Sequence, residues 1–239
     1  MKDNLLDLIQ HTSKLGVIEC LKIEGTDSET KITALAEDKT VIVYGKFQNP
    51  VADFIGTFGM PNLGTLNSVL SMDEYDENAT ITVEKNSDDQ PVNIHFNTTN
   101  NDYENDYRLM SKQLVEEKVK PVKFKGASWD IEFAPSVDSI QKLKRQSSAL
   151  NNEATFTVKT VGQDIRAYLG DQSSHAGNFV FTSNVGSLKK AWSYPIKVFT
   201  SILDLPGDKT VKFSDQGVAE ITVDSGISTY QYLIPAQQK

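Results

Sequence analysis

The stretch from Pro135 to Leu150, PSVDSIQKLKRQSSAL, guides the interpretation of the whole chain. A proline at its start is typical of the first turn of a helix, and apolar residues follow at helical spacing: Val137, Ile140 and Leu143. At 100° per residue, Lys142 and Arg145 fall opposite this apolar stripe, and Lys144 falls nearer to it. The stretch therefore predicts a short helix with one packing face and one basic face.

This basic helix stands in an acidic chain. The 239 residues carry 32 Asp and Glu against 24 Lys and Arg, a formal net charge of -8. Residues 1–125 hold 21 acidic and 13 basic side chains, whereas residues 126–239 hold 11 of each. Because phosphate contacts dominate affinity for nucleic acid, this balance argues against a protein that grips DNA tightly. A role on DNA would require a geometry that tolerates the negative charge.

Length and composition favour two domains in a cytoplasmic protein. A chain of this length can form two domains of about 120 residues, each able to bury a core. No apolar run approaches the roughly 18 residues of a membrane span, and the beginning, MKDNLLDLIQHTSK, is too polar for a signal peptide. The lone cysteine, Cys20, lies in the apolar run 17–23 and is expected to be buried.

Outward from the basic helix, the chain is a succession of short strands and few helices. An amphipathic helix is predicted over residues 2–14, with Leu5, Leu6, Leu8, Ile9 and Thr12 on the packing side and Asp7, Gln10, His11 and Lys14 on the polar side. A second helix is predicted over 63–71, and strands over 17–23, 31–35, 40–47, 53–58, 79–84, 92–97 and 106–113. Residues 112–125, KQLVEEKVKPVKFK, read as a connector, because Pro121 cannot join a regular ladder.

After the connector the same order of elements starts again. Strands are predicted over 129–133, 153–161, 164–169, 178–183, 210–214, 218–223 and 229–235, an extended stretch over 192–195, and helices over 135–150 and 197–205. We therefore expect a first domain over 1–118, a connector over 119–127 and a second domain over 128–239. The sequence LNSVL at 66–70 aligns with FTSIL at 199–203 at an offset of 133 residues. Leu6 and Ile9 align with Ile140 and Leu143 at an offset of 134, which predicts an internal duplication.

The duplication predicts an α+β fold in which each half places two short helices on an antiparallel sheet. Strands at the open edges would need partners, and strand addition between subunits supplies them. Such head-to-tail pairing closes into a ring.

In this order of elements the chain resembles the sliding clamps, the DNA polymerase processivity factors, of T-even-like bacteriophages. The resemblance is carried by NLGTLNSVLS (62–71), IQKLKRQSSALNNEATFTV (140–158), FTSILDLPGDKTVKF (199–213) and TYQYLIPA (229–236). It implies a non-catalytic homotrimeric ring around duplex DNA that reads no sequence, tethers DNA polymerase and uses no metal or cofactor. It also implies an ATP-dependent clamp loader and late-transcription factors as partners, and a location in the host cytoplasm.

The resemblance also implies two sets of site residues. Helix residues facing the DNA would be Lys14, Lys142, Lys144, Arg145 and Lys197, and Ser148 stands where a further basic residue is implied. A closed ring does not need tight phosphate binding to stay on DNA, so a modest basic surface suffices in an acidic chain. A partner peptide would contact the end of the last strand at Tyr232, Ile234 and Pro235, and the connector at Val119 or Val122. The junction between subunits is an alternative place for such a peptide.

Two other classes of function stay open at this point. Strand-rich duplicated halves also suit a structural ring of a phage tail or baseplate, and the many carboxylates leave room for an enzyme. The chain holds no GxSxG, P-loop or HExxH pattern. Its histidines, His11, His95 and His175, have no metal-ligand spacing with each other or with Cys20. We therefore expect no catalytic residue and no metal ligand.

Overall fold

The computed structural model describes residues 1–120, 124, 126–171 and 173–237. The chain forms two compact units. The first consists of Met1–Lys123 together with Ser225–Tyr230, and the second of Phe124–Asp224 together with Gln231–Lys239. The short segment Ser225–Tyr230 is therefore part of the first unit, although it lies late in the sequence.

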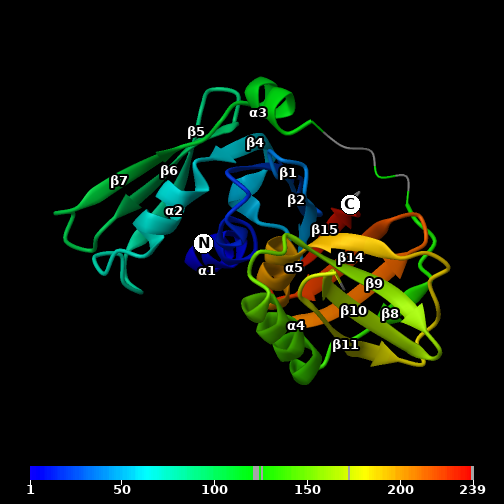
Figure 1. Cartoon of the computed structure of the whole chain (residues 1–239). Helices are drawn as coiled ribbons and strands as arrows, with labels where there is room; N and C mark the ends of the chain where they lie inside the picture. Colours follow the sequence, from blue (N-terminus) through cyan, green and yellow to red (C-terminus); the bar gives the residue numbers. More distant parts are fainter. Residues whose placement is uncertain (121–123, 125, 172, 238–239) are drawn as a thin grey trace. The chain divides into compact units, whose positions relative to one another are not determined.

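The first unit contains two sets of antiparallel strands and several helical segments (Figure 1). One set has the order β4-β1-β2-β3, formed by β1 (Cys20–Gly25), β2 (Thr30–Leu35), β3 (Ile42–Phe47) and β4 (Gly56–Pro61). The other has the order β5-β6-β7, formed by β5 (Thr80–Lys85), β6 (Pro91–Asn97) and β7 (Glu104–Arg108). The helical segments are α1 (Lys2–His11), α2 (Leu63–Leu70), α3 (Lys112–Lys118) and the single turns η1 (Ser13–Leu15) and η2 (Ala52–Phe54).

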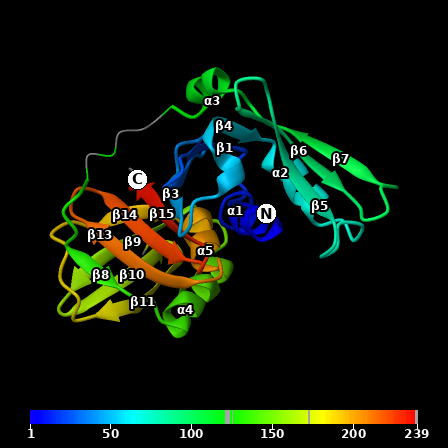
Figure 2. The same cartoon turned by 180° about the vertical axis from the view of Figure 1, so that it is seen from behind.

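The second unit repeats this plan (Figure 2). One sheet has the order β11-β10-β9-β12, formed by β9 (Thr155–Val161), β10 (Asp164–Gly170), β11 (Ala176–Ser183) and β12 (Trp192–Pro195). Four further strands have the order β15-β14-β13-β8: β15 (Ser228–Pro235), β14 (Val218–Asp224), β13 (Asp208–Ser214) and β8 (Ile131–Phe133). The first three residues of β15, 228–230, belong to the first unit and the rest of the strand to the second. The helices are α4 (Val137–Ala149) and α5 (Ile196–Leu203).

The strand order shows the duplication directly. Four successive strands of the first unit, β1 to β4, lie side by side in the order β4-β1-β2-β3, and β9 to β12 of the second unit lie in the corresponding order β12-β9-β10-β11. Three further strands then follow α2 in one unit and α5 in the other. The expected fold class, α+β with antiparallel sheets and few short helices, is confirmed.

An aromatic core fixes the helices of the second unit. The ring of Phe199, on α5, is stacked on Phe213 at 6.0 Å between centroids. It also meets Phe156 of β9 edge-on at 4.9 Å and Tyr194 of β12 at 6.2 Å. Helix α4 contacts α5 and strands β10 and β11, and its Leu143 is fully buried. The charged residues of α4 and α5 therefore stand on a rigid support.

The start of the stretch 112–125, read from the sequence as a connector, corrects one prediction. Residues 112–118 form helix α3, where the sequence suggested the end of a strand and the start of a connector. Val115 and Val119 lie one helical turn apart and pack with Cys20, which is buried as predicted. Similarly, residues 52–54 form a turn and the strand begins only at Gly56, later than the expected 53.

Two predicted helix faces are also wrong in part. On α1, Leu6 is 39% exposed, whereas Asp7 and His11, placed on the polar side, are buried. On α4, Val137 is 77% exposed and Ser139 is buried in its place. The Ser139 hydroxyl donates to the carbonyl of Ser136, so this polar side chain is satisfied where it is buried.

Candidate nucleic-acid interface

Helix α4 starts from a side-chain cap. The backbone N–H of Ser139 donates to Oγ of Ser136 at 3.1 Å, which satisfies one of the free donors of the first turn. Asp138 also lies in this turn, where a negative charge is favoured by the helix dipole. The cap and the buried Leu143 fix the direction in which the basic side chains of α4 extend.

The three basic residues of α4 have different partners. Nζ of Lys142 lies 2.6 Å from Oδ2 of Asp138, one turn earlier. Nζ of Lys144 lies 2.8 Å from Oδ1 of Asp204, at the C-terminal end of α5. Arg145 is exposed and, in the part of the chain that the structure describes, forms no ion pair.

Lys197 extends from α5. It is exposed between the buried residues Ile196 and Val198, so its ammonium group points away from the aromatic core. Since α4 and α5 contact each other, the structure brings Lys142, Lys144, Arg145 and Lys197 onto one pair of helices. Lys14 is exposed on η1 of the first unit and not on a regular helix. A DNA contact by any of these residues stays a prediction.

The predicted partner residues fall into both units. In the first unit Val119 is buried and lines a pocket of about 230 Å³ beside the β2–β3 turn, together with Glu19, Cys20, Leu35, Ala36, Glu37 and Lys118. Burial raises the pKa of the Cys20 thiol. In the second unit Tyr232 and Ile234 are fully buried and Pro235 is exposed. Val122 lies outside the described residues. Contact of these residues with a partner stays a prediction.

A buried polar cluster in the first unit was missed at the sequence level. The Tyr230 hydroxyl donates to Oδ2 of Asp7 at 2.8 Å, and Nδ1 of His11 lies 3.2 Å from Oδ1. The His11 ring stacks on Tyr230 with 4.7 Å between centroids. Burial raises the pKa of Asp7, but hydrogen bonds with His11, Ser225 and Tyr230 outweigh it and hold that pKa below 3.8. Asp7 and His11 stand four positions apart on one helix, and this spacing could have indicated that their side chains meet.

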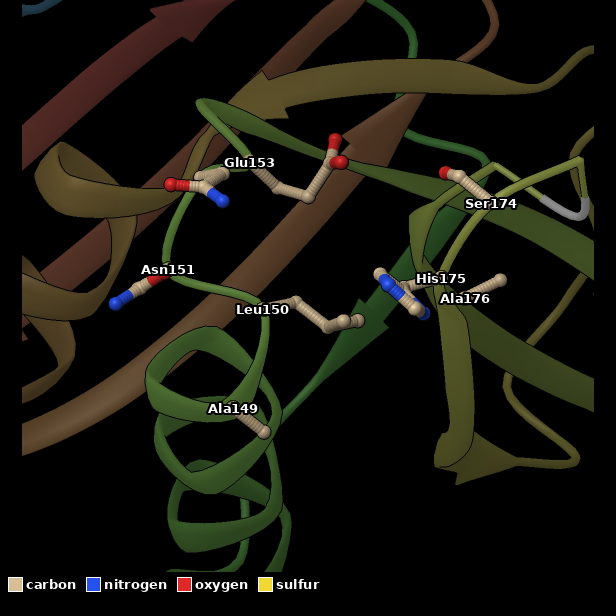
Figure 3. A pocket seen from close by; sticks show the side chains of 8 residues that line it. Ala149, Leu150, Asn151, Glu153, Ser174, His175 and Ala176 are labelled. Carbon is tan, nitrogen blue, oxygen red and sulfur yellow. The ribbon is translucent and has the colours of Figure 1, made fainter.

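The second unit carries a larger pocket, of about 810 Å³, after the end of α4. Figure 3 shows Leu150, Glu153 and His175 around it, on the loop that follows α4 and at the start of β11. Within the described residues, no hydrogen bond joins the Glu153 carboxylate to the His175 ring. The Ser174 hydroxyl donates to the carbonyl of Asp171, and among the described lining residues no hydrogen bond joins it to the His175 ring.

Two kinds of feature are absent from the described residues. No group of three or more His, Cys, Asp or Glu side chains is arranged to hold a metal ion. None of the described helices has the length and apolar character needed to cross a membrane.

Comparison with known proteins gives structural matches only. No protein-family model and no curated protein sequence matches the chain. A structure of A. fulgidus PCNA with the C-terminal region of FEN-1 bound to it matches with a TM-score of 0.70 and 8% identity, over 98% of this chain and 96% of that chain. PCNA from Thermococcus kodakaraensis matches with a TM-score of 0.67 and 11% identity, over 99% and 97%. The chain thus has, over nearly its whole length, the fold of the PCNA-type sliding clamps.

Proposed function

We propose that this protein is a DNA sliding clamp, a non-catalytic ring that encircles duplex DNA and tethers a replicative DNA polymerase to it. The observation that carries the proposal is the duplicated clamp fold, which extends over 98% of the chain in the match to A. fulgidus PCNA. Tethering keeps the local concentration of polymerase at the template high, and it requires no chemical step by the clamp.

The edges of the sheets support assembly into a ring. Among the described strands, β7 pairs only with β6, and β11 pairs only with β10. Each therefore presents a row of backbone N–H and C=O groups along one side. Pairing β7 of one copy with β11 of the next is a head-to-tail contact, which closes into a ring when the rotation fits. Three copies of two units each give the homotrimer that the resemblance to phage clamps implies.

The proposed contact with DNA is electrostatic and weak. Lys14, Lys142, Lys144, Arg145 and Lys197 would meet phosphates without reading bases, since phosphate contacts position a protein and carry no sequence information. A closed ring stays on DNA because of its topology, so the net charge of -8 does not prevent its function.

The proposed partners are DNA polymerase, an ATP-dependent clamp loader and late-transcription factors. The A. fulgidus PCNA structure, which holds the C-terminal region of FEN-1, supports a clamp fold that captures a segment of a partner. On this chain the candidates for that role are Val119, with its pocket in the first unit, and Tyr232, Ile234 and Pro235 on β15. Assignment to a T-even-like phage and to the host cytoplasm rests on the sequence resemblance.

Loading onto DNA tests the proposal. We expect a trimer by light scattering, and retention on nicked circular duplex, but not on linear duplex, after incubation with a phage-type clamp loader and ATP. Primer extension should give longer products only when clamp, loader and ATP are all present. A stable monomer without effect on product length would overturn the proposal. A ring that never loads and is instead found in purified virions would favour a structural ring.

A further inference from the structure

Two of the cations on the α4–α5 surface are already paired with carboxylates. Lys142 with Asp138 and Lys144 with Asp204 form ion pairs of 2.6 and 2.8 Å. Both carboxylates are exposed, with side-chain exposures of 68% and 49%. They therefore stand on the same surface as the basic side chains, and any polyanion that approaches Lys142 or Lys144 also approaches Asp138 or Asp204.

The two carboxylates differ in what they do for the fold. Asp138 lies in the first turn of α4, where the helix dipole favours a negative charge. Asp204 is the C-terminal cap residue of α5, where the dipole disfavours one. The helix dipole thus explains why an acidic residue stands at position 138, but it does not explain the one at position 204. The partner of Asp204 is Lys144, 60 positions earlier in the chain.

The remaining cations on these helices are not compensated in this way. Arg145 and Lys197 are exposed and, among the described residues, neither forms an ion pair with a carboxylate. The surface therefore combines two nearly neutral Lys–Asp pairs with two full positive charges.

We propose that Asp138 and Asp204 are restraining residues, which mask Lys142 and Lys144 and leave Arg145 and Lys197 as the net cations that meet DNA. This inference rests on the proposed function. Affinity for duplex DNA rises with the number of phosphates that a protein neutralises, because each one releases counterions. A lysine with a carboxylate beside it contributes little to that release. The two aspartates thereby limit the grip of the ring on DNA, which lets a closed ring slide.

The salt dependence of binding tests this assignment. The full-length protein, its Asp138→Asn and Asp204→Asn variants and the double variant would be titrated against a short linear duplex by fluorescence anisotropy at several salt concentrations. We expect each substitution to steepen the slope of log K against log salt by about 0.9, and the double variant by about twice that amount. Each step of 0.9 corresponds to a roughly 3.5-fold larger loss of affinity between 50 and 200 mM salt.

Matched variants separate local masking from net charge. Asp88→Asn, in the β5–β6 turn of the first unit, changes the net charge of the chain by the same amount as Asp138→Asn or Asp204→Asn. It should leave the slope of log K against log salt unchanged. Arg145→Gln and Lys197→Gln should each flatten it by about 0.9, whereas Lys142→Gln and Lys144→Gln should change it much less. Asp138→Asn and Asp204→Asn slopes equal to that of the wild type would overturn the proposal, as would an equal effect of Asp88→Asn.

Retention of the wild type on circular DNA separates the two proposals. If the wild type is loaded and retained but Asp138→Asn and Asp204→Asn leave its slope unchanged, the masking is wrong and the clamp function stands. If the wild type is never retained on circular DNA, the clamp function itself fails. Light scattering and a thermal melt of each variant confirm that the assembly is intact. Asp204→Asn is the more informative variant, because no loss of helix stability is expected from it.

Discussion

The hydroxyl of Tyr230 donates a hydrogen bond to Oδ2 of Asp7 across 223 positions of the sequence, at 2.8 Å. Both atoms are buried, and the His11 ring stacks on the same tyrosine. Through this bond the segment Ser225–Tyr230, which includes the start of β15, is held against the first helix of the chain.

Removing the Tyr230 hydroxyl tests the strength of this bond. In Tyr230→Phe the ring and its stacking on His11 stay, but a buried carboxylate loses one donor. A hydrogen bond to a charged group is worth about 1.5–3 kcal/mol, so we expect the free energy of unfolding in urea to fall by that amount. Tyr103→Phe, at a half-exposed tyrosine on the surface, should change it by less than about 0.5 kcal/mol. Equal effects of the two substitutions would contradict the role given to Tyr230.

The same cluster predicts a pH dependence of stability. The pKa of Asp7 is lower in the folded chain than its ordinary value of 3.8, so the unfolded chain binds the proton first. The contribution of Asp7 is therefore present above pH 3.8 and is lost as the pH falls through the folded pKa. The difference in the free energy of unfolding in urea between the wild type and Asp7→Asn should therefore become smaller as the pH is lowered below 3.8. A difference that stays constant with pH would exclude this linkage.

Phe199 is expected to dominate the core of the second unit. Its ring contacts Phe156, Tyr194 and Phe213, and no part of it is exposed. Phe199→Ala should lower the free energy of unfolding by about 3–5 kcal/mol, measured in urea. Val137→Ala, on the neighbouring helix but 77% exposed, serves as the control and should cost less than about 0.5 kcal/mol. A loss at Phe199 as small as that at Val137 would be inconsistent with this core.

The reactivity of the Cys20 thiol tests how α3 packs against β1. A Cβ added at Gly59 would lie 2.7 Å from a methyl carbon of Val115, so Gly59→Ala should push α3 away from Cys20. We expect slow reaction of the native thiol with a thiol reagent, because Cys20 is buried and its pKa raised, and a faster reaction in Gly59→Ala. Gly64→Ala, where a Cβ meets nothing within 4 Å, should leave the rate unchanged. Equal rates in all three proteins would contradict this packing.

Much of the fold could be predicted because its signals are local. Helix α2 was expected over 63–71 and runs over Leu63–Leu70, since proline, asparagine and regularly spaced leucines mark its start and its packing face. The strands after it begin within a few residues of their expected positions for the same reason. The repeat itself predicted that the second unit would follow the first in its order of elements.

What the sequence concealed depends on distant partners. Asp7 and His11 look polar and exposed until Tyr230, far along the chain, is placed against them. The pairing of Lys144 with Asp204 is equally non-local, whereas Lys142 and Asp138 stand one helical turn apart and could have been paired from spacing alone. Helix α3 was missed because its charged residues obscured the two valines, Val115 and Val119, that mark its buried side.

The placement of Ser225–Tyr230 limits the modularity of a chain that looks like two tandem copies. Because these residues belong to the first unit, the polypeptide passes from one unit to the other three times and not once. A fragment of residues 1–123 would lack the Tyr230 hydroxyl that donates to Asp7. We therefore expect it to be less stable than the first unit of the intact chain. Conversely, after a single cleavage near residue 120, the segment Ser225–Tyr230 of the first unit would be carried by the C-terminal fragment. A boundary drawn between the two repeats of the sequence therefore does not separate two complete folding units.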